Sequence, residues 1–257
     1  MNSGKDFIVH NANILDYSNS SDEFHDIEIR GGVIDRIVDA GEGDFQDFDE
    51  DQSFDAEGKL VSPTLIEPHC HLDATLTAGE PRWNSSGTLA EGINIWGDRK
   101  KDITKEGLKE RATKTAEWYA SHGVTKIRTH ADSTENSLKG LKGLIELKDE
   151  ISDIVDLQVV AFPQDGIFTS EENEDLHREA VEMGADVVGG IPHNEHTRED
   201  GVKDVNYALN LAEKHDKIID IHIDETDDPQ SRFTEVLASE SIKRGLEEIV
   251  TASHTTA

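Results

Sequence analysis

The sequence EPHCHLD at residues 67–73 follows a mostly apolar run, LVSPTLI at residues 60–66, which predicts a β-strand. Side chains alternate between the two faces of a strand, so His69 and His71 are expected to point the same way. Two imidazoles side by side at the end of a strand can supply half of a metal site. Taken alone, the pair could also be two surface or core histidines that happen to lie two residues apart.

From about residue 63 the sequence alternates between strand and helix patterns. Several of the strands are nearly continuous apolar runs, which are typical of a parallel sheet buried on both faces. The expected strands are residues 64–69, 124–130, 157–162, 186–191, 218–223 and 249–253. The expected helices are residues 104–121, 137–150, 172–183, 202–215 and 230–244.

Each of the six expected strands ends at or near a polar side chain. These residues are His71, His130, Gln164, His193, His222 and His254. They recur roughly every thirty residues, the size of one βα unit, apart from a longer first interval that predicts an extended loop at about 74–102. A (β/α)₈ barrel places its active site at such strand ends. The absence of a glycine-rich phosphate loop after the first strand argues against an open doubly wound sheet.

The chain is expected to have two parts, a small β module at residues 1–62 and a barrel at residues 63–257. In the module, residues 7–12 and 13–16 are β-rich, and residues 26–30 and 33–38 form a hairpin through Gly31 and Gly32. The acidic residues 41–52 predict a solvated loop. Only six barrel strands are expected before residue 257. We therefore expect an incomplete barrel, either part of a longer protein or completed by a second chain.

The amino-acid composition restricts the binding partners and the cellular compartment that we expect for this protein. The 257 residues include 55 Asp and Glu against 25 Lys and Arg, a net charge of −30, which disfavours binding to nucleic acid and anionic membranes. Cys70 is the only cysteine, so no intrachain disulfide can form. The sequence has no membrane-spanning apolar run, and residues 1–7 do not resemble a secretory signal. We expect a cytoplasmic protein.

Further residues extend the histidine pair into a candidate catalytic site. His222 would add a third neutral imidazole, and three imidazoles that leave open positions on a metal are typical of catalytic sites. Glu225 could move a proton, His254 could steady a hydroxide or polarise a carbonyl, and Gln164 offers an amide donor and acceptor. The alternatives are a structural core histidine for His222, one surface acid among 55 for Glu225, and a polar loop residue for Gln164.

Two further features bear on the metal. The fourth expected strand, residues 186–191, contains no lysine that could be carbamylated to bridge two ions, which favours a mononuclear site. Strand alternation turns Cys70 away from the paired histidines, so packing is its expected role.

The chain resembles the amidohydrolase superfamily, and within it the bacterial-type cytosine deaminases. HxHLD at residues 69–73 specifies only the superfamily. The more specific motifs are FPQ at residues 162–164, QSRF at residues 230–233 and SHTTA at residues 253–257. The resemblance implies a TIM-type barrel with a small N-terminal β module. It also implies one Fe²⁺ or Zn²⁺ ion held by His69, His71 and His222.

The resemblance further implies hydrolysis of cytosine to uracil and ammonia, a step in pyrimidine salvage. Glu225 would act as proton shuttle and His254 would assist the activation of water. Gln164 would recognise the pyrimidine ring, and Leu89 and Phe162 would line the ring pocket. The alternative substrates are a triazine, a creatinine-like ring or isoguanine.

Members of the family continue for two more strands, the last of which supplies an aspartate ligand. We therefore expect the N-terminal part of such an enzyme, lacking that ligand and inactive or poorly folded by itself. The remaining alternatives are a non-catalytic remnant and one half of a split barrel. Such a chain could form a homo-oligomer or associate with a second chain that completes the barrel.

The acidic residues are spread along the chain, which suggests adaptation to a salt-rich cytosol. We predict that the melting temperature rises between low salt and molar KCl, because counterions screen repulsion among the surplus carboxylates. Circular dichroism measures the change, and sucrose at equal osmolality controls for general solute exclusion. A melting temperature that does not rise with KCl would contradict salt adaptation.

Overall fold

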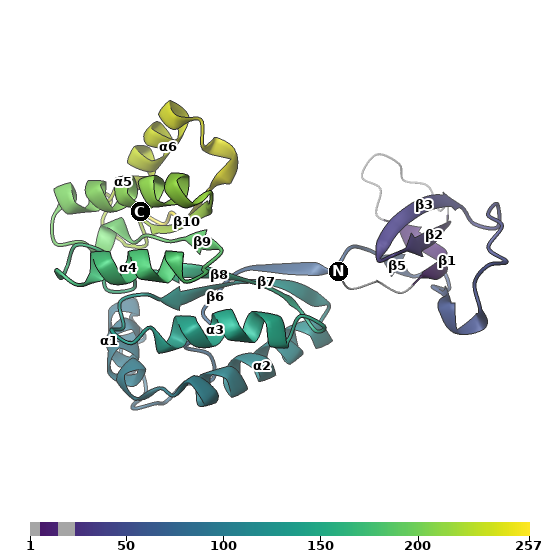
Figure 1. Cartoon of the computed structure of the whole chain (residues 1–257), viewed down its shortest axis with the longest axis horizontal. Coiled ribbons are helices and arrows are strands. Elements are labelled where there is room, and N and C mark those ends of the chain that lie inside the picture. The colour runs from purple at the N-terminus through teal and green to yellow at the C-terminus, as the bar shows by residue number, and fades with distance from the viewer. Residues whose placement is uncertain (1–5, 15–23) are drawn as a thin grey trace. The chain divides into compact units, whose positions relative to one another are not determined.

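The computed structural model describes residues 6–14 and 24–257, which belong to two compact units. The first unit is Met1–Thr64 and the second is Leu65–Ala257 (Figure 1). Each unit has its own sheet and its own apolar core.

The first unit is a small β module. Its strands are β1 (Phe7–Ile14), β2 (His25–Arg30), β3 (Val33–Asp39), β4 (Ser53–Asp55) and β5 (Leu60–Val61), with a 3₁₀ turn, η1 (Glu50–Gln52). The sheet order is β3-β2-β1-β4, and β5 pairs with β1. The predicted hairpin is present, and Gly31 and Gly32 make its turn with φ of 58° and 82°.

The core of this module is small. It consists of Ala12, Ile27, Ile29 and Ala56 with a few half-buried neighbours. The two β-rich runs expected at residues 7–12 and 13–16 form the single strand β1, which the structure describes as far as Ile14. Leu15, Asp16 and residues 1–5 of the polar N-terminus lie outside the described residues.

The second unit is built on one parallel sheet whose strands follow chain order. The strands are β6 (Leu65–Cys70), β7 (Val124–Asp132), β8 (Asp156–Phe162), β9 (Val187–Val188), β10 (Ile218–Ile223) and β11 (Val250–His254). The connecting helices are α1 (Leu89–Arg99), α2 (Lys105–Ser121), α3 (Lys139–Glu150), α4 (Asn173–Glu182), α5 (Arg198–His215) and α6 (Phe233–Arg244). A curled parallel sheet with this βα order confirms the predicted fold class.

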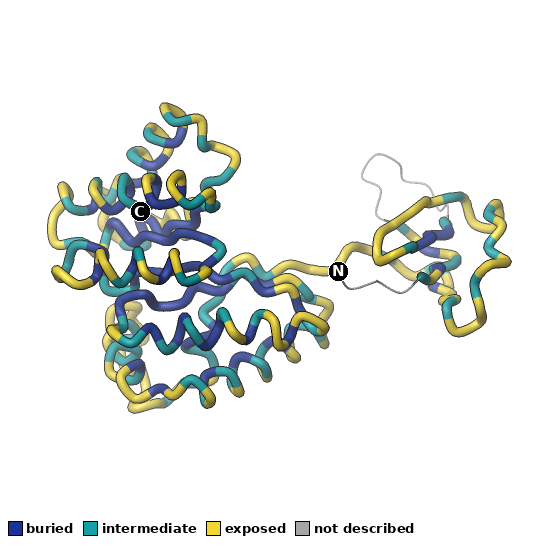
Figure 2. Tube along the Cα trace, viewed as in Figure 1, coloured by how far each residue is buried: buried dark blue, intermediate teal, exposed yellow. Residues whose placement is uncertain are grey.

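Alternation along the strands separates the core from the polar interior of the curl. On β10, Ile219, Ile221 and Ile223 belong to the apolar core that the helices cover, whereas Asp220 and His222 lie on the opposite face. Figure 2 shows the buried strands between helices whose outer faces are exposed. No helix in the described part of the chain is both long and apolar enough to cross a bilayer.

The sheet curls far enough for its first and last strands to touch through side chains. His69 Nδ1, on β6, lies 3.2 Å from Ser253 Oγ on β11. Arg128 on β7 donates from Nη1 to Asp220 Oδ2 on β10 at 2.9 Å. These contacts bring polar side chains that are far apart in the sequence together on the inner face of the curl.

The prediction of an extended loop at 74–102 is wrong in its second half. This stretch contains α1 and a 3₁₀ turn, η2 (Lys100–Asp102). Thr88 caps α1, because its side chain accepts a hydrogen bond from the backbone N–H of Glu91 at 3.3 Å. Thr88 and Glu91 have the spacing of a capping box, so the sequence did carry a helix signal here.

The fourth strand is shorter than the predicted 186–191. Only Val187 and Val188 belong to β9, and the chain then passes through Gly189 and Gly190 to a 3₁₀ turn, η3 (Pro192–Asn194). Gly189 donates from its backbone N–H to Ala161 O at 2.8 Å. A Cβ at Gly189 would lie 2.4 Å from the same oxygen, so only glycine allows this approach of β9 to β8.

We predict that Gly189→Ala lowers the free energy of unfolding by about 1–3 kcal/mol, because the added methyl group must push two backbones apart. Urea denaturation measures the change. Gly97→Ala is the control, since a Cβ there meets nothing within 4 Å. That variant should be unchanged or more stable by up to about 1 kcal/mol. Equal effects of the two variants would contradict this role of Gly189.

Candidate metal centre and active site

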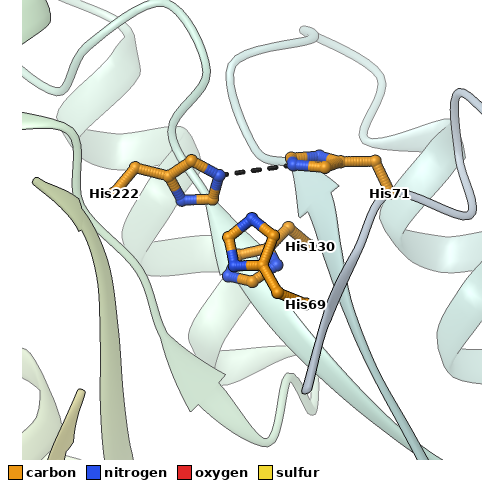
Figure 3. Close-up of side chains that lie close together, drawn as sticks. All are labelled: His69, His71, His130 and His222. Atoms are coloured by element: carbon orange, nitrogen blue, oxygen red, sulfur yellow. Dashed lines mark hydrogen bonds between the residues drawn. The ribbon is translucent and has the colours of Figure 1, made fainter. Parts of the chain in front are cut away.

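Four imidazoles meet at the carboxyl ends of three strands. His69 and His71 come from the end of β6, His130 from β7 and His222 from β10, and one ligand atom of each lies within 4.8 Å of the others. Figure 3 shows a nitrogen of His69 turned toward the space between His71 and His222. The Nε2 atoms of His71 and His222 are 3.3 Å apart.

The chemistry of these nitrogens fits a divalent cation. His69 Nε2, His222 Nδ1 and both nitrogens of His130 are buried without a hydrogen-bond partner among the described residues. Burial and then the neighbouring imidazoles lower the pKa of His71 to about 3, and burial with the same neighbours lowers the pKa of His69 to about 4. The same causes lower the pKa of His222. Neutral imidazoles with unshared lone pairs are suited to metal binding.

His130 is the member of the cluster that the sequence did not assign to the metal. Its side chain is fully buried, and its ring centroid lies 4.1 Å from that of His69. Its position at a strand end was visible in the sequence. Only the curl of the sheet shows that its ring reaches the other three.

Glu225 and His254 form an acid–base pair beside the imidazoles. Glu225 Oε2 lies 3.6 Å from His254 Nε2. Burial raises the pKa of Glu225, and the charge of His254 opposes this rise. His254 has a φ of 75°, a left-handed conformation that costs energy for a side chain other than glycine and is concentrated at functional sites.

The loop that carries Glu225 is anchored by the carboxylate of Asp224. That carboxylate accepts hydrogen bonds from the backbone N–H groups of Phe233 at 3.0 Å and Thr234 at 2.9 Å. It also accepts from the hydroxyl of Ser231 at 2.7 Å. These bonds fix the loop against the start of α6, which explains why α6 begins at Phe233 rather than at the predicted residue 230.

The imidazoles open into a cavity of about 770 Å³. Phe162 stacks on His222 with ring centroids 4.0 Å apart, and Leu89 contributes a wall from the start of α1. The structure places every site residue named from the sequence on this cavity: His69, His71, Leu89, Phe162, Gln164, His222, Glu225 and His254. Their individual roles stay predictions.

Cys70 lies outside the ligand set. Its thiol is 3.6 Å from Arg128 O and packs against the apolar core. Burial raises the pKa of the Cys70 thiol to about 12, which disfavours the thiolate that a metal requires.

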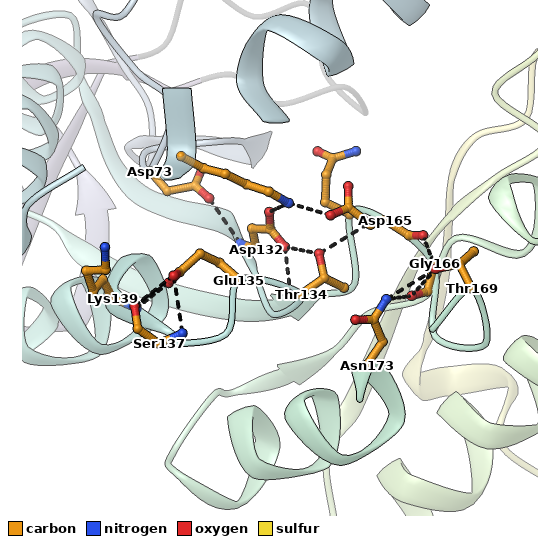
Figure 4. Close-up of polar contacts among 12 residues, drawn as sticks. Asp73, Asp132, Thr134, Glu135, Ser137, Lys139, Asp165, Gly166, Thr169 and Asn173 are labelled. Carbon is orange, nitrogen blue, oxygen red and sulfur yellow. Dashed lines mark hydrogen bonds and ion pairs between the residues drawn. The ribbon is translucent and has the colours of Figure 1, made fainter. Parts of the chain in front are cut away.

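A buried lysine ties the wall of the cavity to the sheet. Lys100, only 8% exposed, follows α1 and donates to Asp132 Oδ2 at 2.8 Å and Asp165 Oδ2 at 2.5 Å. Asp132 donates from its backbone N–H to Asp73 Oδ2 at 3.0 Å, and Figure 4 shows these carboxylates together. Because Asp165 adjoins Gln164 in the chain, the lysine connects α1, the end of β7 and the Gln164 loop.

The comparisons with known proteins agree with this architecture. A family model described as "Amidohydrolase family" matches residues 52–147. N-isopropylammelide isopropyl amidohydrolase from Pseudomonas sp. (strain ADP) is 33% identical over 97% of this chain and 60% of its own. The structure of 5-methylcytosine deaminase from Klebsiella pneumoniae liganded with 5-fluorocytosine is 46% identical. The TM-score of this match is 0.90, and the match covers 97% of this chain and 59% of that chain.

Together these matches support the amidohydrolase superfamily, which confirms the resemblance drawn from the motifs of this chain. Within that superfamily its relatives include proteins of the cytosine deaminase type. Another relative, pterin deaminase from Rhizobium rhizogenes, is 26% identical over 89% of this chain. The chain spans about 60% of the length of the relative from Pseudomonas.

We predict that Lys100→Met lowers the free energy of unfolding by about 3–5 kcal/mol, because the buried Asp132 carboxylate loses its cation. Lys101→Met is the matched control, since that lysine is exposed and pairs with Asp98 at 3.2 Å. Its effect should stay below about 1 kcal/mol. Chemical denaturation measures both, and similar losses in the two variants would contradict a structural role specific to Lys100.

Proposed function

We propose that this chain carries the active site of a metal-dependent hydrolytic deaminase, which acts on a C–N bond of a cyclic amidine and most favourably on cytosine. The observation that carries the proposal is a cluster of neutral, unpartnered imidazoles that opens into a cavity holding an acid–base pair. The 46% identity to a 5-methylcytosine deaminase supports this substrate class.

His69, His71 and His222 would hold one Fe²⁺ or Zn²⁺ ion, with His130 directly beside them. Such an ion supplies Lewis acidity and makes hydroxide available near neutral pH. The protein keeps these imidazoles neutral through burial, so they need not lose protons before binding.

Glu225 is the proposed proton carrier. Its raised pKa suits a group that takes a proton from water and returns it to the departing nitrogen. The water oxygen would add to C4 of cytosine, the bond to the amino group would break, and uracil and ammonia would leave. His254, 3.6 Å from Glu225, would assist the activation of water.

Gln164 and the apolar walls would position the ring. One amide provides both a donor and an acceptor, which match the N–C=O edge of a pyrimidine. The Gln164 loop is held in place because Asn194 Nδ2 donates to Gln164 O at 3.2 Å. Phe162 and Leu89 would contact the flat faces of the ring.

A related aminohydrolase activity on a triazine is the second candidate. The relative from Pseudomonas, named for its action on N-isopropylammelide, matches 97% of this chain at 33% identity. The cavity of about 770 Å³ has room for an alkylated triazine as well as for cytosine.

The cytoplasmic location stays a prediction from the sequence.

We predict that the purified protein binds one equivalent of Zn²⁺ and that His222→Ala weakens this binding at least tenfold, because a ligand is lost. His122→Ala, a change at an exposed histidine, should bind as the wild type does. Glu225→Gln should keep the metal but slow ammonia release from cytosine at least a hundredfold. Chelator competition and an ammonia assay measure these effects, and N-isopropylammelide serves as the alternative substrate.

Two results would contradict the proposal. One is a wild-type protein that binds no divalent metal. The other is a wild-type protein that releases ammonia from cytosine together with a Glu225→Gln variant that releases it equally fast.

A further inference from the structure

A chain of hydrogen bonds leads from the imidazole cluster to a buried carboxylate. His69 Nδ1 lies 3.2 Å from Ser253 Oγ, and Ser253 Oγ donates to Asp220 Oδ1 at 2.6 Å. The three residues come from β6, β11 and β10. Strand pairing places Ser253 opposite His222, so the sheet register fixes the position of its hydroxyl.

The charge on Asp220 determines the direction of these hydrogen bonds. Asp220 has no solvent exposure, and its Oδ2 accepts from Arg128 Nη1 at 2.9 Å. A guanidinium is always protonated in proteins, so it favours the ionised carboxyl. An ionised carboxylate can only accept, and the single proton of the Ser253 hydroxyl must therefore point to Asp220.

The consequence for His69 is a fixed tautomer. Since its only hydroxyl proton is directed to Asp220, Ser253 can interact with His69 Nδ1 only as an acceptor. His69 then carries its proton on Nδ1 and has a lone pair on Nε2. That second nitrogen is buried without a partner among the described residues, and Figure 3 shows a His69 nitrogen facing the cluster.

We propose that Asp220 and Ser253 are positioning residues, which hold His69 in the Nδ1–H tautomer and so present its Nε2 lone pair to the metal. This inference rests on the proposed metal site but assigns new roles to two residues that are not among the candidate ligands. Removing the hydrogen-bond partner of a metal-binding histidine typically weakens metal affinity by about 10–100-fold.

The ion pair between Arg128 and Asp220 extends this arrangement to β7. His130 Nε2 lies 3.8 Å from Asp220 Oδ1, so the same carboxylate also faces a second imidazole of the cluster. Arg128 is itself held by Gln158, whose Oε1 accepts from Arg128 Nε at 2.7 Å. The carboxylate is therefore fixed from β7 and β11 at once.

The first test is a measurement on the metal-free wild-type protein. Long-range ¹H–¹⁵N correlation spectra of histidine-labelled protein distinguish the two tautomers, and the His69 signals are identified by their loss in His69→Gln. We expect His69 in the Nδ1–H form. An Nε2–H form would overturn the inference, and this result needs neither metal binding nor a variant at Ser253.

The second test compares Zn²⁺ affinities by competition with a chromophoric chelator. Ser253→Ala should bind about 10–100-fold more weakly, whereas Ser253→Thr keeps a hydroxyl and should stay within about threefold of the wild type. Thr251→Val is the matched control, because it removes a hydroxyl from the same face of β11, 3.5 Å from Arg128. Its affinity should be unchanged.

The outcomes separate this inference from the proposed function. Equal Zn²⁺ affinity of Ser253→Ala and wild type would overturn the positioning role while leaving the metal site intact. A wild-type protein that binds no Zn²⁺ would overturn the proposed function instead, and the tautomer measurement would still decide whether Ser253 accepts from His69.

Discussion

The curl of the parallel sheet is the constraint on which the site depends. Adjacent parallel strands pair backbone to backbone, but β6 and β11 meet only through side chains, across the inside of the curl. Without that curvature, His69 and His71 on the first strand could not reach His222 on the fifth. The covering helices stabilise the curvature, since they pack on the face that carries the apolar residues of each strand.

Burial of the imidazoles has a price in stability. Buried polar atoms without hydrogen-bond partners typically cost about 1–3 kcal/mol each, and several nitrogens of this cluster are of that kind. A protein selected for stability alone would fill this space with apolar side chains. The unpartnered nitrogens therefore indicate a ligand-binding role, and burial gives them the neutral state that binding requires.

The large negative charge of the chain contrasts with the way its buried acids are paired. The whole chain carries a net charge of −30, yet the buried acids near the cavity each have a specific partner. Asp132 pairs with Lys100, Asp220 pairs with Arg128, and Asp224 accepts backbone hydrogen bonds from the start of α6. Such buried pairs contribute order around the site rather than large net stability.

Local sequence patterns predicted the βα order, the parallel sheet and several of the residues that line the cavity. Strand alternation and the spacing of polar strand ends depend only on local geometry, so the sequence could predict that His69, His71 and His222 lie together. Only the folded chain showed that His130 joins them, that α1 lines the cavity, and that Ser253 connects His69 to Asp220. These features are contacts between segments far apart in the chain, and they depend on the curvature of the sheet, which no local pattern encodes.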